Sequence, residues 1–131
     1  MDLASLLLTA VLFGGMVFYS FGFAPVLFKL MPVADARPIL RGTFPYYYLA
    51  IIGLSFIAAL AAFFVSPVAA ILIALIFAST VYARQLLMPK INQATDKDNK
   101  PLFKKLHGFS VVIQLIQILL SGWALVIIAN A

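Results

Sequence analysis

The stretch FKKLHGFSVVIQLIQILLSGWALVIIA, residues 103–129, decides the fold. A basic start passes into an apolar segment in which polar side chains recur every three or four residues. They are His107, Ser110, Gln114, Gln117 and Ser121. At 3.6 residues per turn, this spacing places them on one stripe of a helix. Because the other faces are apolar, the segment is predicted to cross a membrane with its polar stripe turned to protein, water or a ligand.

Three further stretches are long and apolar enough to cross a bilayer, which takes about 20 residues. The four predicted helices cover residues 3–28, 46–65, 67–87 and 106–129. Only Ser66 separates the second from the third, and Pro67 suits a first helical turn. We therefore expect an all-α fold in which residues 1–131 form a single transmembrane domain. It is an integral membrane four-helix bundle of antiparallel, up-and-down topology.

The composition excludes several classes of protein. Of the 131 residues 65% are hydrophobic and 10% charged, whereas a soluble domain carries about 25% charged residues. The chain has no cysteine, which excludes disulfides and thiolate metal sites. Its net charge of +5 comes from residues that flank the apolar segments. The expected partner is therefore the lipid bilayer and not a nucleic acid.

The cations also predict an orientation. They occupy the two predicted loops, at residues 29–45 and 88–105, and the end of the third helix. They are Lys29, Arg37, Arg41, Arg84, Lys90, Lys97, Lys100, Lys104 and Lys105. Because such residues concentrate on the cytoplasmic side, both termini are expected on the non-cytoplasmic side of a bacterial inner membrane. The start of the chain lacks the basic region of a signal peptide, so the first apolar segment is expected to be retained.

The cytoplasmic ends of the helices carry the candidate binding residues. Consecutive tyrosines at residues 46–48 point in different directions around a helix, so at least one is expected to turn inward. A guanidinium near the end of the third helix can pair with a carboxylate or phosphate. The predicted pocket consists of Tyr46, Tyr47, Tyr82, Arg84, His107, Ser110, Gln114 and Gln117. Lys90, Lys104 and Lys105 are the expected headgroup contacts.

Three blocks, taken in order, resemble a known family. They are Phe44-Pro45-Tyr46-Tyr47, Ala83-Arg84 with Pro89-Lys90, and Phe103 with Leu106-His107-Gly108-Phe109-Ser110. With Gly14-Gly15 and Ala24-Pro25, they resemble the transmembrane-protein-205-like proteins over about residues 5 to 128. The resemblance implies a small four-helix membrane protein and supplies no established catalytic residues.

The favoured hypothesis is a non-enzymatic membrane module that binds a lipid, another amphiphile or a partner protein. The competing interpretation treats the polar stripe as helix–helix packing, the tyrosines as an interfacial belt and Arg84 as a side chain that reaches the headgroups. No metal site or catalytic residue is predicted, and the sequence identifies no particular cofactor. One alternative function is a haem or redox protein with His107 as an axial ligand. Another is a small oligomeric transporter; a homo-oligomer or another membrane protein is the expected protein partner.

Overall fold

The computed structural model describes residues 2–131, and these residues are almost entirely helical. The elements are α1 (Leu3–Val17), η1 (Phe18–Phe23), α2 (Ala24–Leu30), α3 (Val33–Phe63), α4 (Pro67–Tyr82), η2 (Ala83–Leu87), α5 (Met88–Asp96) and α6 (Lys100–Ala129). They join into four helices long and apolar enough to cross a membrane, Leu3–Leu30, Val33–Phe63, Pro67–Asp96 and Lys100–Ala129. The chain is therefore an all-helical, multi-pass membrane protein.

The helices extend well beyond the predicted spans. The predicted loop at residues 29–45 is helical except at residues 31–32, and that at residues 88–105 is helical except at residues 97–99. Hydropathy marks only the apolar part of a helix, so polar extensions such as α5 escape it. Pro38 and Pro45, which favoured a loop, lie inside α3. Each removes one backbone hydrogen bond, a loss that a helix of this length tolerates.

Two π-helical segments, η1 and η2, interrupt the first and third long helices. Each ends directly before an Xaa-Pro pair, Ala24-Pro25 and Met88-Pro89. Proline has no N–H for the carbonyl four residues earlier, and its ring collides with that carbonyl. In both places the preceding residue instead donates to a carbonyl five residues back, Ala24 to Tyr19 and Met88 to Ala83. The wider turns give the proline rings room.

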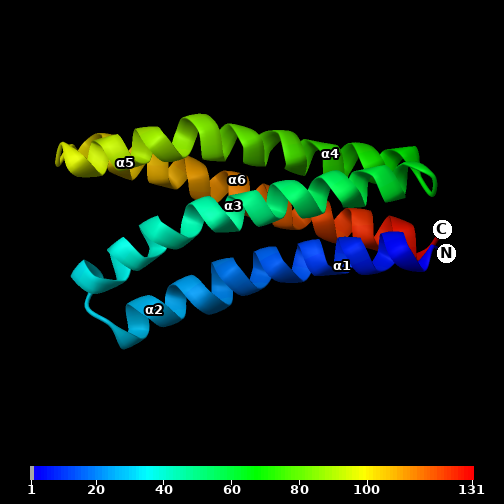
Figure 1. Cartoon of the computed structure of the whole chain (residues 1–131), viewed down its shortest axis with the longest axis horizontal. Helices are drawn as coiled ribbons and strands as arrows, with labels where there is room; N and C mark the ends of the chain where they lie inside the picture. Colours follow the sequence, from blue (N-terminus) through cyan, green and yellow to red (C-terminus); the bar gives the residue numbers. More distant parts are fainter. Residues whose placement is uncertain (1) are drawn as a thin grey trace.

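Contacts between the helices close a ring: α1 packs on α3 and α6, and α4 packs on the same two. The buried centre contains Leu12, Met16, Ile73, Ile76 and Ile128, with alanines between them. In Figure 1 both termini and the α3–α4 turn lie at one end, and the α2–α3 and α5–α6 connections lie at the other. We call the second of these the connection end.

The outer surface is apolar. Of the most apolar part of each long helix, only 17 to 39% is buried within the chain. Bulky side chains such as Phe18, Leu119 and Trp123 point outward and are exposed. A surface that is apolar over the length of four helices suits a lipid bilayer, which agrees with the composition.

Candidate functional site

A groove of about 720 Å³ lies at the connection end. All four long helices line it, through η1 and α2, the first half of α3, α5, and the first half of α6. In Figure 1 this is the end where α2 and the start of α3 diverge from α5. The groove has a charged rim and an inner end that reaches into the apolar part of the helices.

At the rim, a column of side chains joins α3 to α6. The guanidinium carbon of Arg37 lies 5.5 Å from the centre of the Phe103 ring, within the range of a cation–π contact. The other partner of Phe103 is His107, whose ring is stacked on it at 5.5 Å and 8°. All three side chains line the groove. Arg37 and His107 are exposed, so the rim offers polar groups to an approaching ligand.

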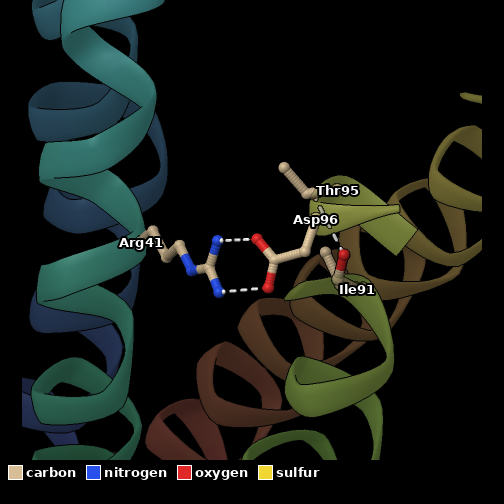
Figure 2. A network of polar contacts seen from close by, with 4 residues as sticks. All are labelled: Arg41, Ile91, Thr95 and Asp96. Atoms are coloured by element: carbon tan, nitrogen blue, oxygen red, sulfur yellow. Dashed lines mark hydrogen bonds and ion pairs between the residues drawn. The ribbon is translucent and has the colours of Figure 1, made fainter. Parts of the chain in front are cut away.

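An ion pair ties α3 to α5 beside this column. Figure 2 shows the Arg41 guanidinium facing the Asp96 carboxylate, with two parallel hydrogen bonds of 2.7 and 3.0 Å. Directly before Asp96 in α5, the Thr95 hydroxyl donates to the carbonyl of Ile91, one turn earlier, at 3.0 Å. The side chains of Arg41 and Asp96 are 44% and 59% exposed. An ion pair exposed to water contributes little to the free energy of unfolding. Its main effect is therefore to fix the spacing of α3 and α5.

Aromatic rings form the inner end of the groove. Tyr19 of η1 stacks on Tyr47 of α3, with ring centres 4.0 Å apart and planes 13° apart, and meets Phe44 edge-on at 5.2 Å. The Tyr19 hydroxyl shares a hydrogen bond of 2.8 Å with Thr43. Tyr48 is 5% exposed and completes this wall. The stack holds the π-helical turn of the first long helix against α3.

Two polar atoms at this inner end make no well-formed hydrogen bond and lie close to the Tyr47 hydroxyl. They are the Ser20 hydroxyl oxygen and the Gln114 side-chain nitrogen, and both are shielded from solvent. The two residues line the groove from η1 and α6, and both approach the Tyr47 hydroxyl. Buried polar groups are nearly always paired, because an unpaired donor costs about 1 to 3 kcal/mol. Both atoms therefore face the Tyr47 hydroxyl, behind the wall of the groove.

The groove also opens sideways, toward the surface that lipid covers. Phe21, Phe28 and Leu115 line it and are 59%, 42% and 43% exposed. Phe21 and Phe28 belong to the first long helix and Leu115 to α6. A long apolar chain could therefore leave the groove between η1–α2 and α6 without crossing water.

The structure brings part of the predicted pocket together. His107, Ser110 and Gln114 line the groove, and Tyr47 lies directly behind its aromatic wall. Ser110 is 7% exposed and is near Tyr48, the third of the consecutive tyrosines. At least one inward tyrosine was expected, and the most buried of the three is Tyr48.

The other predicted pocket residues lie elsewhere. Tyr46 is 75% exposed, and Tyr82 is exposed beside Phe109. Arg84 donates from Nε to the Pro45 carbonyl at 3.2 Å and from Nη1 to Gln85 at 3.0 Å. It thus links η2 to α3.

Gln117 is a contact between helices. Its amide nitrogen donates to Ser79 at 2.7 Å and to Thr80 at 3.0 Å, both on α4. Gln117 is 3% exposed and does not line the groove. The polar stripe of α6 is therefore divided: Gln114 faces the groove and Gln117 faces α4.

Of the three lysines expected at the headgroups, Lys104 and Lys105 are exposed on α6. Lys90 is exposed on α5, at a smaller hollow of about 380 Å³ between α5 and α6. Among residues 2–131, no three His, Asp or Glu side chains gather as a metal site would require.

Sequence reasoning missed Arg37, Arg41, Tyr19 and Ser20 as lining residues. Lining residues Arg37, Arg41, Phe44 and Tyr48 are spaced by four, three and four positions, the period of one helix face. That signal was present, but residues 29–45 were predicted to form a loop between the first two helices.

The profile of a family described as a domain of unknown function (DUF4149) matches residues 7–100. The match covers the first three long helices and ends where α6 begins. No curated protein and no solved structure matches the chain. None of these comparisons names the transmembrane-protein-205-like proteins, so that resemblance stays a prediction.

Proposed function

The chain belongs to the DUF4149 family, whose function is unknown, and from its geometry we propose that it binds a membrane lipid or similar amphiphile in the groove. In this proposal the protein is non-enzymatic and positions its ligand at the membrane boundary. The observation that carries it is the groove itself, with mainly apolar walls, a few polar groups and an opening toward lipid.

The size and lining of the groove fit this role. Its volume of about 720 Å³ falls within the range of about 300 to 1,000 Å³ typical of ligand sites. Such sites combine apolar walls with a small number of placed polar groups. Here the apolar walls come from residues such as Phe28 and Ile118, and the polar groups from the rim and the inner end. Filling a cavity with such apolar walls by water alone is unfavourable in free energy, because the water finds few hydrogen-bond partners there.

The proposal includes a membrane placement. The four long helices cross the bilayer as an antiparallel, up-and-down bundle, with the connection end in the cytoplasm of a bacterium and both termini across the inner membrane. All nine cations lie in elements near the connection end, and cations concentrate on the cytoplasmic side. The groove rim then stands at the level of the inner-leaflet headgroups.

Exposed cations anchor that end to anionic lipid. Lys90, Lys104 and Lys105 are exposed, and each cation near an anionic surface contributes about 1 kcal/mol of attraction. Arg84, in η2, holds α3 in place through its hydrogen bond to the Pro45 carbonyl. Haem binding at His107, transport and a dedicated protein partner remain predictions from the sequence, with no specific contact in their favour.

Native mass spectrometry of protein extracted gently from its own membrane tests the proposal. Val111 lines the groove, whereas its neighbour Val112 is 55% exposed and does not. Val111→Trp would fill the groove and Val112→Trp would add the same bulk outside it. We expect a retained amphiphile in the wild type and in Val112→Trp, and its loss in Val111→Trp. Equal retention by both variants, or none by the wild type, would refute groove binding.

A further inference from the structure

We infer that the rim of the groove is the headgroup site of an anionic phospholipid, with the lipid phosphate beside Arg37 and an acyl chain in the apolar part of the groove. This inference rests on the proposed function and names the class of lipid. It gives a role to Arg37, Lys100 and His107, which line the groove from α3 and α6.

The charges that face the groove favour an anion. Within residues 2–131, three cations and one carboxylate line it: Arg37, Arg41, Lys100 and Asp98. The guanidinium of Arg41 is already neutralised by Asp96, through hydrogen bonds of 2.7 and 3.0 Å. Two cations therefore remain against one acid, before any histidine charge is counted. A ligand with one negative charge balances this surplus, as in other basic pockets between membrane helices on the cytoplasmic side.

Arg37 is placed to bind a phosphate. Among residues 2–131, the pair of Arg41 with Asp96 is the only ion pair, so Arg37 has no carboxylate partner there. Its contact is with the Phe103 ring, 5.5 Å away, and a ring has no oxygen that accepts a hydrogen bond. A guanidinium carries five N–H donors in a rigid fork that fits a phosphate bidentately. The ring therefore holds Arg37 in position and leaves its donors for the ligand.

Phe103 brings Arg37 and His107 to the same part of the rim. Its ring contacts the guanidinium of Arg37, and the His107 ring is stacked on it at 5.5 Å. A histidine has one N–H donor when neutral and two when charged, so His107 can donate to a phosphate oxygen in either state. A phosphate has more than one acceptor oxygen, and it can therefore bind a guanidinium and an imidazole together.

The rim lies at the depth of lipid headgroups. Counted back from Ala129, about 20 residues of α6 reach Ser110, and this length crosses the hydrocarbon core of a bilayer. His107 lies three residues further, which is about 5 Å at about 1.5 Å per residue. The headgroup layer on each side is about 5 to 8 Å thick. His107 therefore falls within the headgroup layer, and Leu115 of the groove falls within the hydrocarbon.

The part of the groove below the rim fits an acyl chain. Its walls include Phe28, Val111 and Ile118, and its sideways opening has Phe21 and Leu115, which are 59% and 43% exposed. A chain attached to a phosphate at the rim would run over these side chains and enter the bilayer without crossing water. The order of the parts of a phospholipid, a charged head and then apolar chains, matches the order along the groove. A soluble phosphate compound would leave the apolar part unfilled.

Titration of the delipidated full-length protein in a neutral detergent, followed by native mass spectrometry, tests the inference. The probes are anionic phosphatidylglycerol and phosphatidylcholine, which has the same phosphate but no net charge, with identical acyl chains. Glycerol 3-phosphate provides the phosphate without the chains. The groove variants are Arg37→Gln and Lys100→Gln. Lys104→Gln is the matched control, because it removes the same charge from an exposed position of the same helix outside the groove.

We expect the wild type to bind phosphatidylglycerol at least about tenfold more tightly than phosphatidylcholine, since hydrogen bonds between charged groups are the stronger ones. Arg37→Gln should weaken phosphatidylglycerol about tenfold and leave phosphatidylcholine unchanged. Lys100→Gln should weaken phosphatidylglycerol by a smaller factor, and Lys104→Gln should have no effect.

Several results would overturn the inference. They are equal affinity of the wild type for the two lipids, an equal loss of both lipids in Arg37→Gln, and equal effects of Lys100→Gln and Lys104→Gln. Binding of glycerol 3-phosphate as tight as that of phosphatidylglycerol would also overturn it, because the ligand would then be a soluble phosphate compound.

The outcome also separates the inference from the proposed function. If the two lipids bind equally and both are lost in Val111→Trp, only the headgroup site is wrong. If Val111→Trp retains every lipid that the wild type retains, groove binding itself is wrong.

Discussion

The contrast between Gln114 and Gln117 predicts opposite effects on stability for the same substitution. Gln117→Leu removes two hydrogen bonds to α4, of 2.7 and 3.0 Å. Hydrogen bonds between membrane helices average about 0.6 kcal/mol each, so the loss is about 1 kcal/mol. The Ser79 and Thr80 hydroxyls keep their own bonds to the Ile76 carbonyl, so neither is left as an unpaired donor. We therefore expect a loss of no more than about 1 kcal/mol.

Gln114→Leu removes a buried nitrogen that makes no well-formed hydrogen bond and lies near the Tyr47 hydroxyl. Since an unpaired buried donor is unfavourable, this variant should be as stable as the wild type or more stable by about 1 kcal/mol. Reversible unfolding in bicelles, on delipidated protein, measures both values. A Gln114→Leu variant less stable than Gln117→Leu would refute the division of the polar stripe into a groove face and a packing face.

Two further predictions concern the connection end. Arg41→Gln and Asp96→Asn should each lower the free energy of unfolding less than Gln117→Leu does, because both side chains of the ion pair are exposed. A double-mutant cycle should show a small coupling energy that vanishes in high salt. A large coupling energy that does not depend on salt would contradict this prediction. Because the chain has no cysteine, single cysteines report orientation. In intact cells a membrane-impermeant thiol reagent should label Phe64→Cys, in the α3–α4 turn, and should label Lys97→Cys only after permeabilisation; the reverse pattern would invert the proposed orientation.

The four membrane-crossing helices were predictable because hydrophobic runs of this length leave few alternatives. Their polar extensions were not, since Arg37 and Arg41 on α3 carry no hydropathy signal and Pro38 argued for a loop. The helix continues because proline costs one hydrogen bond, whereas a loop at this place would forfeit the contact of Phe103 with Arg37 and the ion pair of Arg41.

Of the predicted pocket residues, the structure places His107, Ser110 and Gln114 in the groove, and their role in binding stays a prediction. The stripe on α6 correctly marked side chains turned away from the apolar surface, yet it could not separate Gln114 from Gln117. Gln117 differs from Gln114 because Ser79 and Thr80 of α4 lie beside it, and only the packing of the helices determines that. The role of Arg84 was also open, because its partner is a backbone carbonyl of α3. Every residue has such a carbonyl, so the sequence does not show which one Arg84 contacts.

A structure of the protein in lipid nanodiscs, determined by electron cryomicroscopy with a rigid antibody fragment bound, would test the central claim most directly. Elongated density in the groove, in contact with Gln114 and running out past Leu115, is the predicted result. A groove closed by α2 packed against α6, with no density between them and the Gln114 amide bonded to protein, would contradict it.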